Sequence, residues 1–215
     1  NAGIDIIAEN SLCNYATNPL INIVTSALII LGGLGYIVWW DVLRVVKSRS
    51  PKNRKIFRHL TLHSKIAITV TAGLILAGAV LIFIFEYNNP LTIGKMSLFD
   101  KIQVSLFQSI TTRTAGFATI PQESLTTPSV ILCLLMMFIG GSPVGTAGGI
   151  KTVTICVIIA FAVSAIKGKN DVCLFNKTLS KTAISKACAV CCMSFIILLV
   201  STVLLSACPD PDAMD

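Results

Sequence analysis

Residues 111–118 read TTRTAGFA, and they directly follow a short apolar stretch, Met96 to Ile110. The stretch has 15 residues, several of them polar. At about 1.5 Å per residue it cannot cross a hydrocarbon core of about 30 Å. We therefore expect either a half-helix that re-enters the membrane or an interfacial helix. The half-helix is favoured because it returns the chain to the side of the membrane from which it entered. The flanking ends of the two neighbouring apolar spans then lie on that same side.

Gly116 is the informative residue of the TTRTAGFA stretch. A half-helix that ends in a Thr-x-Gly strand has the form of a potassium-channel filter, where successive backbone carbonyls replace the water around the ion. Such a backbone needs a dihedral angle that glycine adopts without cost. The same string is also typical of an ordinary turn. The start of the chain reads NAGID and shares Ala-Gly with this stretch, which indicates an internal repeat. The two candidate filter strands are Asn1, Ala2, Gly3, Ile4 and Thr114, Ala115, Gly116, Phe117.

Three uncharged runs around these strands are long enough to cross a membrane as helices. They are Leu20 to Trp40, Ile66 to Phe85 and Ala187 to Ala207, of 21, 20 and 21 residues. The chain as a whole is 54% apolar and 13% charged, with a mean hydropathy of +0.81. This composition predicts an all-α membrane protein and argues against disorder or a soluble enzyme.

A fourth apolar run, Ser129 to Ile166, is too long for one span and contains a glycine-rich interruption. Five of the fourteen glycines fall between positions 140 and 149, together with Pro143, so we expect a broken helix. Irregular backbone at membrane depth is tolerated only where it is buried in protein or lines a water-filled path. Lys151 is the only charge in this run. It is interpreted as a gating cation or as a side chain that reaches to the interface.

The basic residues record the orientation of the chain. The formal net charge is +7, and 13 of the 17 basic residues lie in two segments, Arg44 to Lys65 and Lys167 to Lys186. Both segments should be cytoplasmic by the positive-inside bias, so lipid headgroups or a cytosolic partner are expected, and not nucleic acid. We find no Walker loop and no hydrolase or zinc-protease motif, and therefore expect no enzyme activity.

The strings TRTAGF at 112–117 and GTAGGIKT at 145–152, with NAG at 1–3 and ILGGLG at 30–35, resemble the Trk/Ktr/HKT superfamily of potassium uptake proteins, in particular the bacterial KtrB and TrkH membrane subunits. The resemblance covers nearly the whole chain. It implies four repeats of helix, re-entrant pore loop and helix around one pore, in the cell membrane. Ile4 departs from the family, which usually has Phe there.

The resemblance assigns the chain to an internal piece of such a protein, which alone should conduct nothing. It implies the end of the second repeat at 1–46, a cytoplasmic basic linker at 47–64, a complete third repeat with a broken helix at 65–166, a second cytoplasmic linker at 167–186, and the first helix of the fourth repeat at 187–215. The transported ion would be potassium, with no covalently bound cofactor. A homodimer is implied, bound on its cytoplasmic face to a nucleotide-binding regulatory subunit of KtrA/TrkA type that docks on the basic segments.

The resemblance also makes the glycine-rich segment a gating loop below the filter. Its candidate residues are Gly140, Gly141, Ser142, Gly145, Thr146, Gly148, Gly149 and Lys151. Thr112 and Arg113 are expected to support the filter, with Arg113 either braced against Glu123 or Asp100 or exposed at the outer mouth. Glu86 and Glu123 are interpreted as charges of the outer vestibule or as solvated loop ends. The alternatives are a sodium-preferring or sodium-coupled transporter and a non-conducting truncated scaffold.

Overall fold

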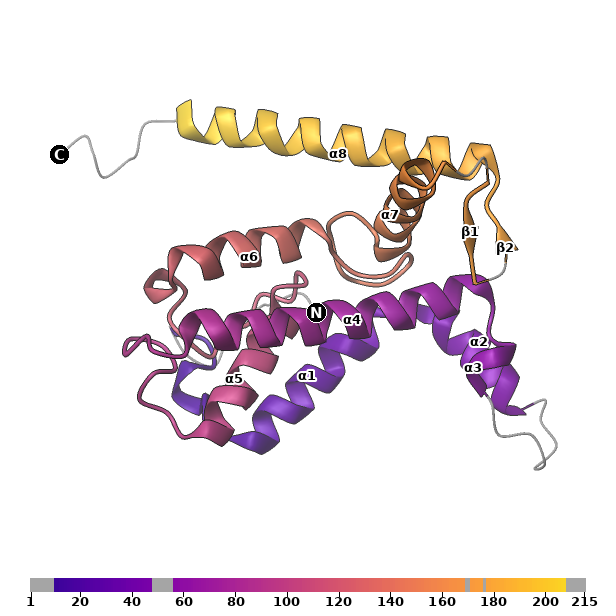
Figure 1. Ribbon diagram of the computed structural model, residues 1–215. Helices are drawn as coiled ribbons and strands as arrows, with labels where there is room; N and C mark the ends of the chain where they lie inside the picture. Colours follow the sequence, from indigo (N-terminus) through magenta and orange to yellow (C-terminus); the bar gives the residue numbers. More distant parts are fainter. Residues whose placement is uncertain (1–9, 48–55, 169–170, 176, 208–215) are drawn as a thin grey trace. The chain divides into compact units, whose positions relative to one another are not determined.

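The computed structural model describes residues 10–47, 56–168, 171–175 and 177–207, and it is mostly helical. The chain divides into two units, residues 1–153 and 154–215. The first holds α1 (Pro19–Gly33), α2 (Tyr36–Lys47), α3 (Ile56–His59), α4 (Leu62–Glu86), α5 (Leu98–Thr111) and α6 (Thr127–Phe138), with 3-10 turns at Cys13–Tyr15 and Gln122–Ser124 (Figure 1). The second holds nearly all of α7 (Thr152–Ile166), β1 (Cys173–Leu174), β2 (Lys177–Thr178) and α8 (Lys181–Ala207).

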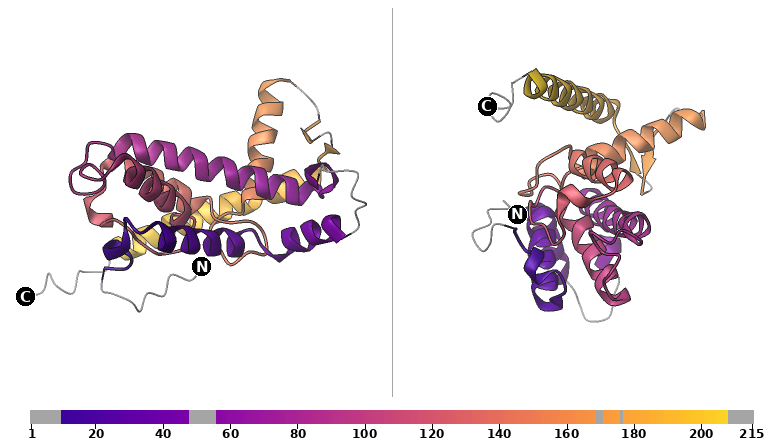
Figure 2. Two further views of the ribbon diagram at one scale, coloured as in Figure 1. Left: turned by 90° about the horizontal axis from the view of Figure 1, so that it is seen from below. Right: turned by 90° about the vertical axis from the view of Figure 1, so that its left-hand side faces the viewer.

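The short helix α5 is the centre of the first unit. It packs against both α4 and α1, and α6 packs against α4 (Figures 1 and 2). Ser97 begins α5 by accepting a hydrogen bond from the N–H of Asp100, as expected of an N-cap serine. Near the other end of α5, Ile29, Ile75 and Ile110 pack together in one buried cluster. The residues that follow α5 are therefore held between α1 and α4.

Two of the predicted spans are confirmed as single helices. α4 has 25 residues and α8 has 27, and both are long and apolar enough to cross a membrane. α5, with 14 residues, has the length of a half-helix. The fourth apolar run is broken as expected, because α6 ends at Phe138 and α7 begins only at Thr152.

The prediction of one continuous helix over Leu20 to Trp40 is wrong. The structure divides this run into α1 and α2, which meet at an angle of 92°. Gly35 lies at the bend with φ of +77°, a conformation that side chains with a Cβ adopt only at a cost. A Cβ at this position would also lie 2.6 Å from the Pro143 carbonyl oxygen, so the bend is packed directly against the glycine-rich segment.

The second linker carries more structure than the sequence indicated. β1 and β2 pair as an antiparallel hairpin in the register Cys173 to Thr178 and Leu174 to Lys177, a small departure from an all-α fold. The N–H of Leu179 donates to the Val172 carbonyl and extends the pairing by one bond. α8 then begins at Lys181, six residues before the uncharged run at Ala187.

Candidate functional site: a turn and a glycine-rich loop

The TTRTAGFA stretch forms a turn at the end of α5. Thr114 and Gly116 both have positive φ, of 64° and 94°. Two hydrogen bonds close the turn on the last residue of α5: the N–H of Ala115 donates to the Thr111 carbonyl at 3.0 Å, and the Thr111 hydroxyl donates to the Phe117 carbonyl at 2.5 Å. Ala115 is buried while Gly116 is exposed. The turn is therefore fixed to the end of α5, and Gly116 remains accessible.

The segment after this turn meets the segment that follows the start of the chain. The N–H of Leu12 donates to the Ala118 carbonyl at 2.9 Å, and the N–H of Ala118 donates to the Ser11 hydroxyl at 3.0 Å. The first candidate filter strand, Asn1, Ala2, Gly3 and Ile4, lies outside the described residues. The structure thus joins the residues that follow the two candidate strands along the chain.

Arg113 is buried, with 6% of its surface exposed. Its Nη2 donates to the Gly140 carbonyl at 3.2 Å and lies 3.4 Å from the Thr71 hydroxyl. The prediction that Arg113 is braced against Glu123 or Asp100 is therefore wrong. The alternative prediction, that Arg113 is exposed at the outer mouth, is wrong as well. Thr112, also buried, donates its hydroxyl to the Ser109 carbonyl and stays within the end of α5.

The Arg113 guanidinium also borders a cavity of about 10 Å³ whose wall includes Gly33, Ile110 and Ala147. Its Nε has no hydrogen-bond partner among the described residues. A cavity of this volume is close to the size of one water molecule. The charge therefore lies at the junction of α1, α5 and the loop, where its attachments are to neutral oxygens.

The loop from Ile139 to Lys151 is held by backbone hydrogen bonds to its own ends. The N–H of Ile150 donates to the Phe138 carbonyl, and the N–H of Thr152 donates to the Gly141 carbonyl. A Cβ on Gly140 would overlap the Gly148 carbonyl, which explains why no larger residue fits there. The Lys151 amine turns back and donates to the Ala147 carbonyl at 2.7 Å, so it is bonded to the predicted gating loop of which it is part.

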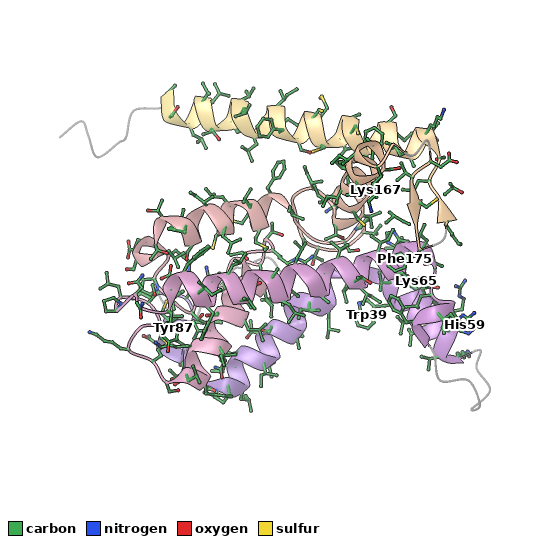
Figure 3. The ribbon with its side chains drawn as sticks, in the orientation of Figure 1. Trp39, His59, Lys65, Tyr87, Lys167 and Phe175 are labelled. Atoms are coloured by element: carbon green, nitrogen blue, oxygen red, sulfur yellow. The ribbon has the colours of Figure 1, made fainter. Side chains whose placement is uncertain are left out.

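The loop also bonds to the bend between α1 and α2. The N–H of Ser142 donates to the Gly33 carbonyl at 3.0 Å, and the N–H of Thr146 donates to the Gly32 carbonyl at 3.3 Å. A third carbonyl at the end of α1, that of Leu31, accepts from the Trp39 indole at 3.0 Å (Trp39 is labelled in Figure 3). These groups satisfy carbonyls that a helix end otherwise leaves open.

One hydrogen bond connects the loop directly to the candidate filter. The N–H of Gly148 donates to the Thr114 hydroxyl at 2.8 Å. Together with the bond from Arg113 to Gly140, it fixes both halves of the loop to consecutive residues of the turn. The structure thus brings together Arg113, Thr114, Gly140, Gly141, Ser142, Gly145, Thr146, Gly148, Gly149 and Lys151 in one assembly.

Glu86, the last residue of α4, is fully buried, which overturns its assignment to the vestibule or to a solvated loop end. One carboxylate oxygen accepts from the N–H and the hydroxyl of Thr126, at 2.9 and 2.7 Å. The other accepts from the Asn89 amide and the Thr92 hydroxyl, at 2.7 and 2.6 Å. Glu86 therefore connects the end of α4 to the start of α6, and Glu123 remains exposed.

Sequence reasoning placed Glu86 wrongly, and it missed Thr71 and the carbonyls at the bend. The one available signal for the bend was the spacing of Gly32, Gly33 and Gly35 inside an otherwise apolar run. Thr71 carries no such signal, because a single hydroxyl within an apolar helix is common.

The chain matches the TrkH family, described as cation transport proteins, over residues 1–214. It is 36% identical over 197 residues to the Ktr system potassium uptake protein B of Bacillus subtilis, covering 92% of this chain and 42% of that protein. It is 34% identical over 206 residues to the potassium/sodium uptake protein NtpJ of Enterococcus hirae, covering 96% of this chain and 43% of that protein. The chain thus spans less than half the length of these relatives.

Among solved structures, the fold is similar to that of the potassium transporter TrkH from Vibrio parahaemolyticus. The TM-score is 0.65 at 16% sequence identity, over 85% of this chain and 38% of that one. At this identity the likeness supports the fold alone. The description of the site residues rests on the hydrogen bonds and burial given above.

Proposed function

This chain belongs to the TrkH family of cation transport proteins, and we propose that it forms part of the pore of a potassium uptake protein in the cell membrane. The observation that carries the proposal is the anchored turn after α5, with Thr114 and Gly116 at positive φ. A short helix followed by a fixed non-helical strand is the arrangement in which backbone carbonyls can take the place of an ion's water. Potassium is the transported substrate, and the members of the family are transporters and not enzymes.

The glycine-rich loop is proposed to gate this pore. It is attached to the candidate filter at Thr114 and Arg113, and to the neighbouring repeat at Gly32 and Gly33. All these bonds except that from Arg113 are between neutral groups, each with a net contribution of about 0.5–1.5 kcal/mol. A loop held by several bonds of this size can be displaced at moderate cost, as a gate requires.

The partners are proposed from the relatives. The Bacillus subtilis relative is named as protein B of a Ktr system, which supports a subunit that works with others. We propose a homodimer that binds a nucleotide-binding regulatory subunit of KtrA/TrkA type through the basic segments Arg44 to Lys65 and Lys167 to Lys186. Opposite charge on the partner would favour this contact and make it salt-dependent.

A sodium-preferring or sodium-coupled transporter is the second candidate. It is favoured by one observation, the 34% identity to a protein named for both potassium and sodium uptake. The two candidates share the same pore and differ in the ion that supports flux.

The test is ion flux into liposomes that contain the full-length protein, compared between wild type, Gly116→Ala and Gly73→Ala. Gly116 has φ of +94°, whereas a Cβ on Gly73, within α4, would meet no atom within 4 Å. We expect potassium flux in wild type and Gly73→Ala and at least a tenfold loss in Gly116→Ala, at equal protein incorporation.

Three results would contradict the proposal. Flux carried by sodium alone would favour the second candidate. Flux unchanged in Gly116→Ala would remove the turn from the pore, and no flux of either ion in a well-folded wild type would leave a non-conducting scaffold.

A further inference from the structure

A groove in the second unit lies outside the turn and the glycine-rich loop, and its rim belongs to the basic segment Lys167 to Lys186. It has a volume of about 350 Å³ and runs between one face of α7 and the segment that leads into the β1–β2 hairpin. Ile159, Ala160, Val163 and Lys167 follow the helical spacing of a single face and form one wall. Asp171, Cys173 and Leu174 belong to the other wall. The volume lies at the lower end of the range for ligand pockets.

The groove is fixed by hydrogen bonds on both sides. The hydroxyl of Ser164, a buried residue of α7, donates to the Asp171 carbonyl at 3.0 Å and ties the two walls together. The hairpin pairing holds Cys173 and Leu174 in register. The groove is thus part of the folded structure of the hairpin and α7.

The groove has an apolar part and a charged rim. Ile159 and Val163 remain 58% and 43% exposed along its length, although both are hydrophobic. Lys167 comes directly after α7 (labelled in Figure 3), and both Lys167 and Asp171 are exposed. Within the described residues these two side chains form no ion pair with each other. One positive and one negative group that are not paired with each other therefore lie beside an apolar channel.

The position of the rim relative to the membrane follows from the sequence. α7 has no charged residue, and Lys167 opens the lysine-rich segment that the positive-inside bias assigns to the cytoplasmic side. The rim is thus expected at the headgroup level, with the apolar part of the groove beside the acyl chains.

We propose that this groove binds one phospholipid with an ethanolamine headgroup. The phosphate is placed at the Lys167 ammonium, the lipid ammonium at the Asp171 carboxylate, and one acyl chain along Ile159 and Val163. An anionic glycerol headgroup would leave Asp171 facing negative charge. A choline headgroup has no N–H to donate to the carboxylate. Both should bind more weakly, and the site does not depend on which ion the pore conducts.

The test is lipid retention by the full-length protein, purified in detergent and supplied with equal amounts of ethanolamine, choline and glycerol phospholipids, with bound lipid counted by native mass spectrometry. The variants are Lys167→Gln and Asp171→Asn. The matched control is Lys177→Gln, which removes the same charge from β2 at an exposed position outside the groove.

We expect wild type and Lys177→Gln to retain the ethanolamine lipid about fivefold better than the other two, as one solvent-exposed charge contact permits. Each groove variant should lose this preference. A second readout needs no variant: ethanolamine lipid should slow maleimide labelling of Cys173, an exposed cysteine of the groove wall.

Equal retention of all three lipids would overturn the proposal. So would a preference for the glycerol lipid that only Lys167→Gln removes, which would indicate a simple anionic site. Unchanged Cys173 labelling in ethanolamine lipid would also overturn it, because a lipid in the groove must shield that cysteine.

Discussion

Replacing Glu86 with Gln should destabilise the protein although the side chain keeps its shape. The carboxylate accepts four hydrogen bonds, two at each oxygen, and is fully buried. The Gln amide has one oxygen and one NH₂ group. The two donors that now bond to one of the carboxylate oxygens would therefore face the NH₂ group, which is itself a donor.

Neither orientation of the Gln amide avoids this conflict. On one side stands the backbone N–H of Thr126, which cannot be turned into an acceptor. On the other stands the Asn89 NH₂, which also donates to the Ser124 carbonyl, while the Asn89 oxygen accepts from the N–H of Leu91. Turning Asn89 over would lose both of these bonds. The hydroxyls of Thr92 and Thr126 can rotate, so only one donor is stranded.

One lost hydrogen bond to a charged group costs about 1.5–3 kcal/mol, and we expect Glu86→Gln to lower the free energy of unfolding by that amount. The assay is a denaturant titration of the full-length protein in detergent micelles. Glu123→Gln is the control, because Glu123 is exposed and its replacement should cost less than about 0.5 kcal/mol. A Glu86→Gln variant within about 0.5 kcal/mol of wild type, or equal losses in both variants, would refute the reasoning.

Two further predictions concern the bend and the loop. Gly35→Ala should destabilise the protein by about 1–3 kcal/mol in the same titration, because φ is +77° and a Cβ would meet the Pro143 carbonyl. Gly33→Ala, with no atom within 4 Å of the new Cβ, should be near neutral, and equal effects would contradict this account of the bend. Lys151→Ala removes the bond to the Ala147 carbonyl and should raise unregulated potassium flux into liposomes, while Lys95→Ala, at an exposed position, should not. Unchanged flux in Lys151→Ala would count against a gating role.

Features that depend on local sequence were predictable. The uncharged length of residues 66–85 and 187–207 is enough to define a span, since crossing a bilayer depends on length and hydropathy alone. The break between α6 and α7 follows from glycines and Pro143 that cannot continue a helix. The short length of α5 follows from the 15-residue apolar stretch that forms it.

Features that depend on distant partners were not predictable. The bend at Gly35 depends on hydrogen bonds to the carbonyls at the end of α1. The N–H groups of Ser142 and Thr146, more than a hundred residues later, donate these bonds. Arg113 was expected to pair with a carboxylate, because a buried arginine is usually paired with an opposite charge. Its guanidinium instead donates hydrogen bonds to the Gly140 carbonyl and the Thr71 hydroxyl. Glu86 looked solvated because it ends a span, and only the fold brings Thr126 to it.

The bend between α1 and α2 has a consequence for biosynthesis. The Gly33 carbonyl accepts a hydrogen bond from the N–H of Ser142, which is 109 residues further along the chain. At about 5–20 residues per second, the ribosome makes that residue roughly 5–20 s later. An unsatisfied carbonyl in hydrocarbon costs several kcal/mol, so the newly inserted run is expected to stay straight during that interval. The bend is therefore a late event, completed only when the loop arrives.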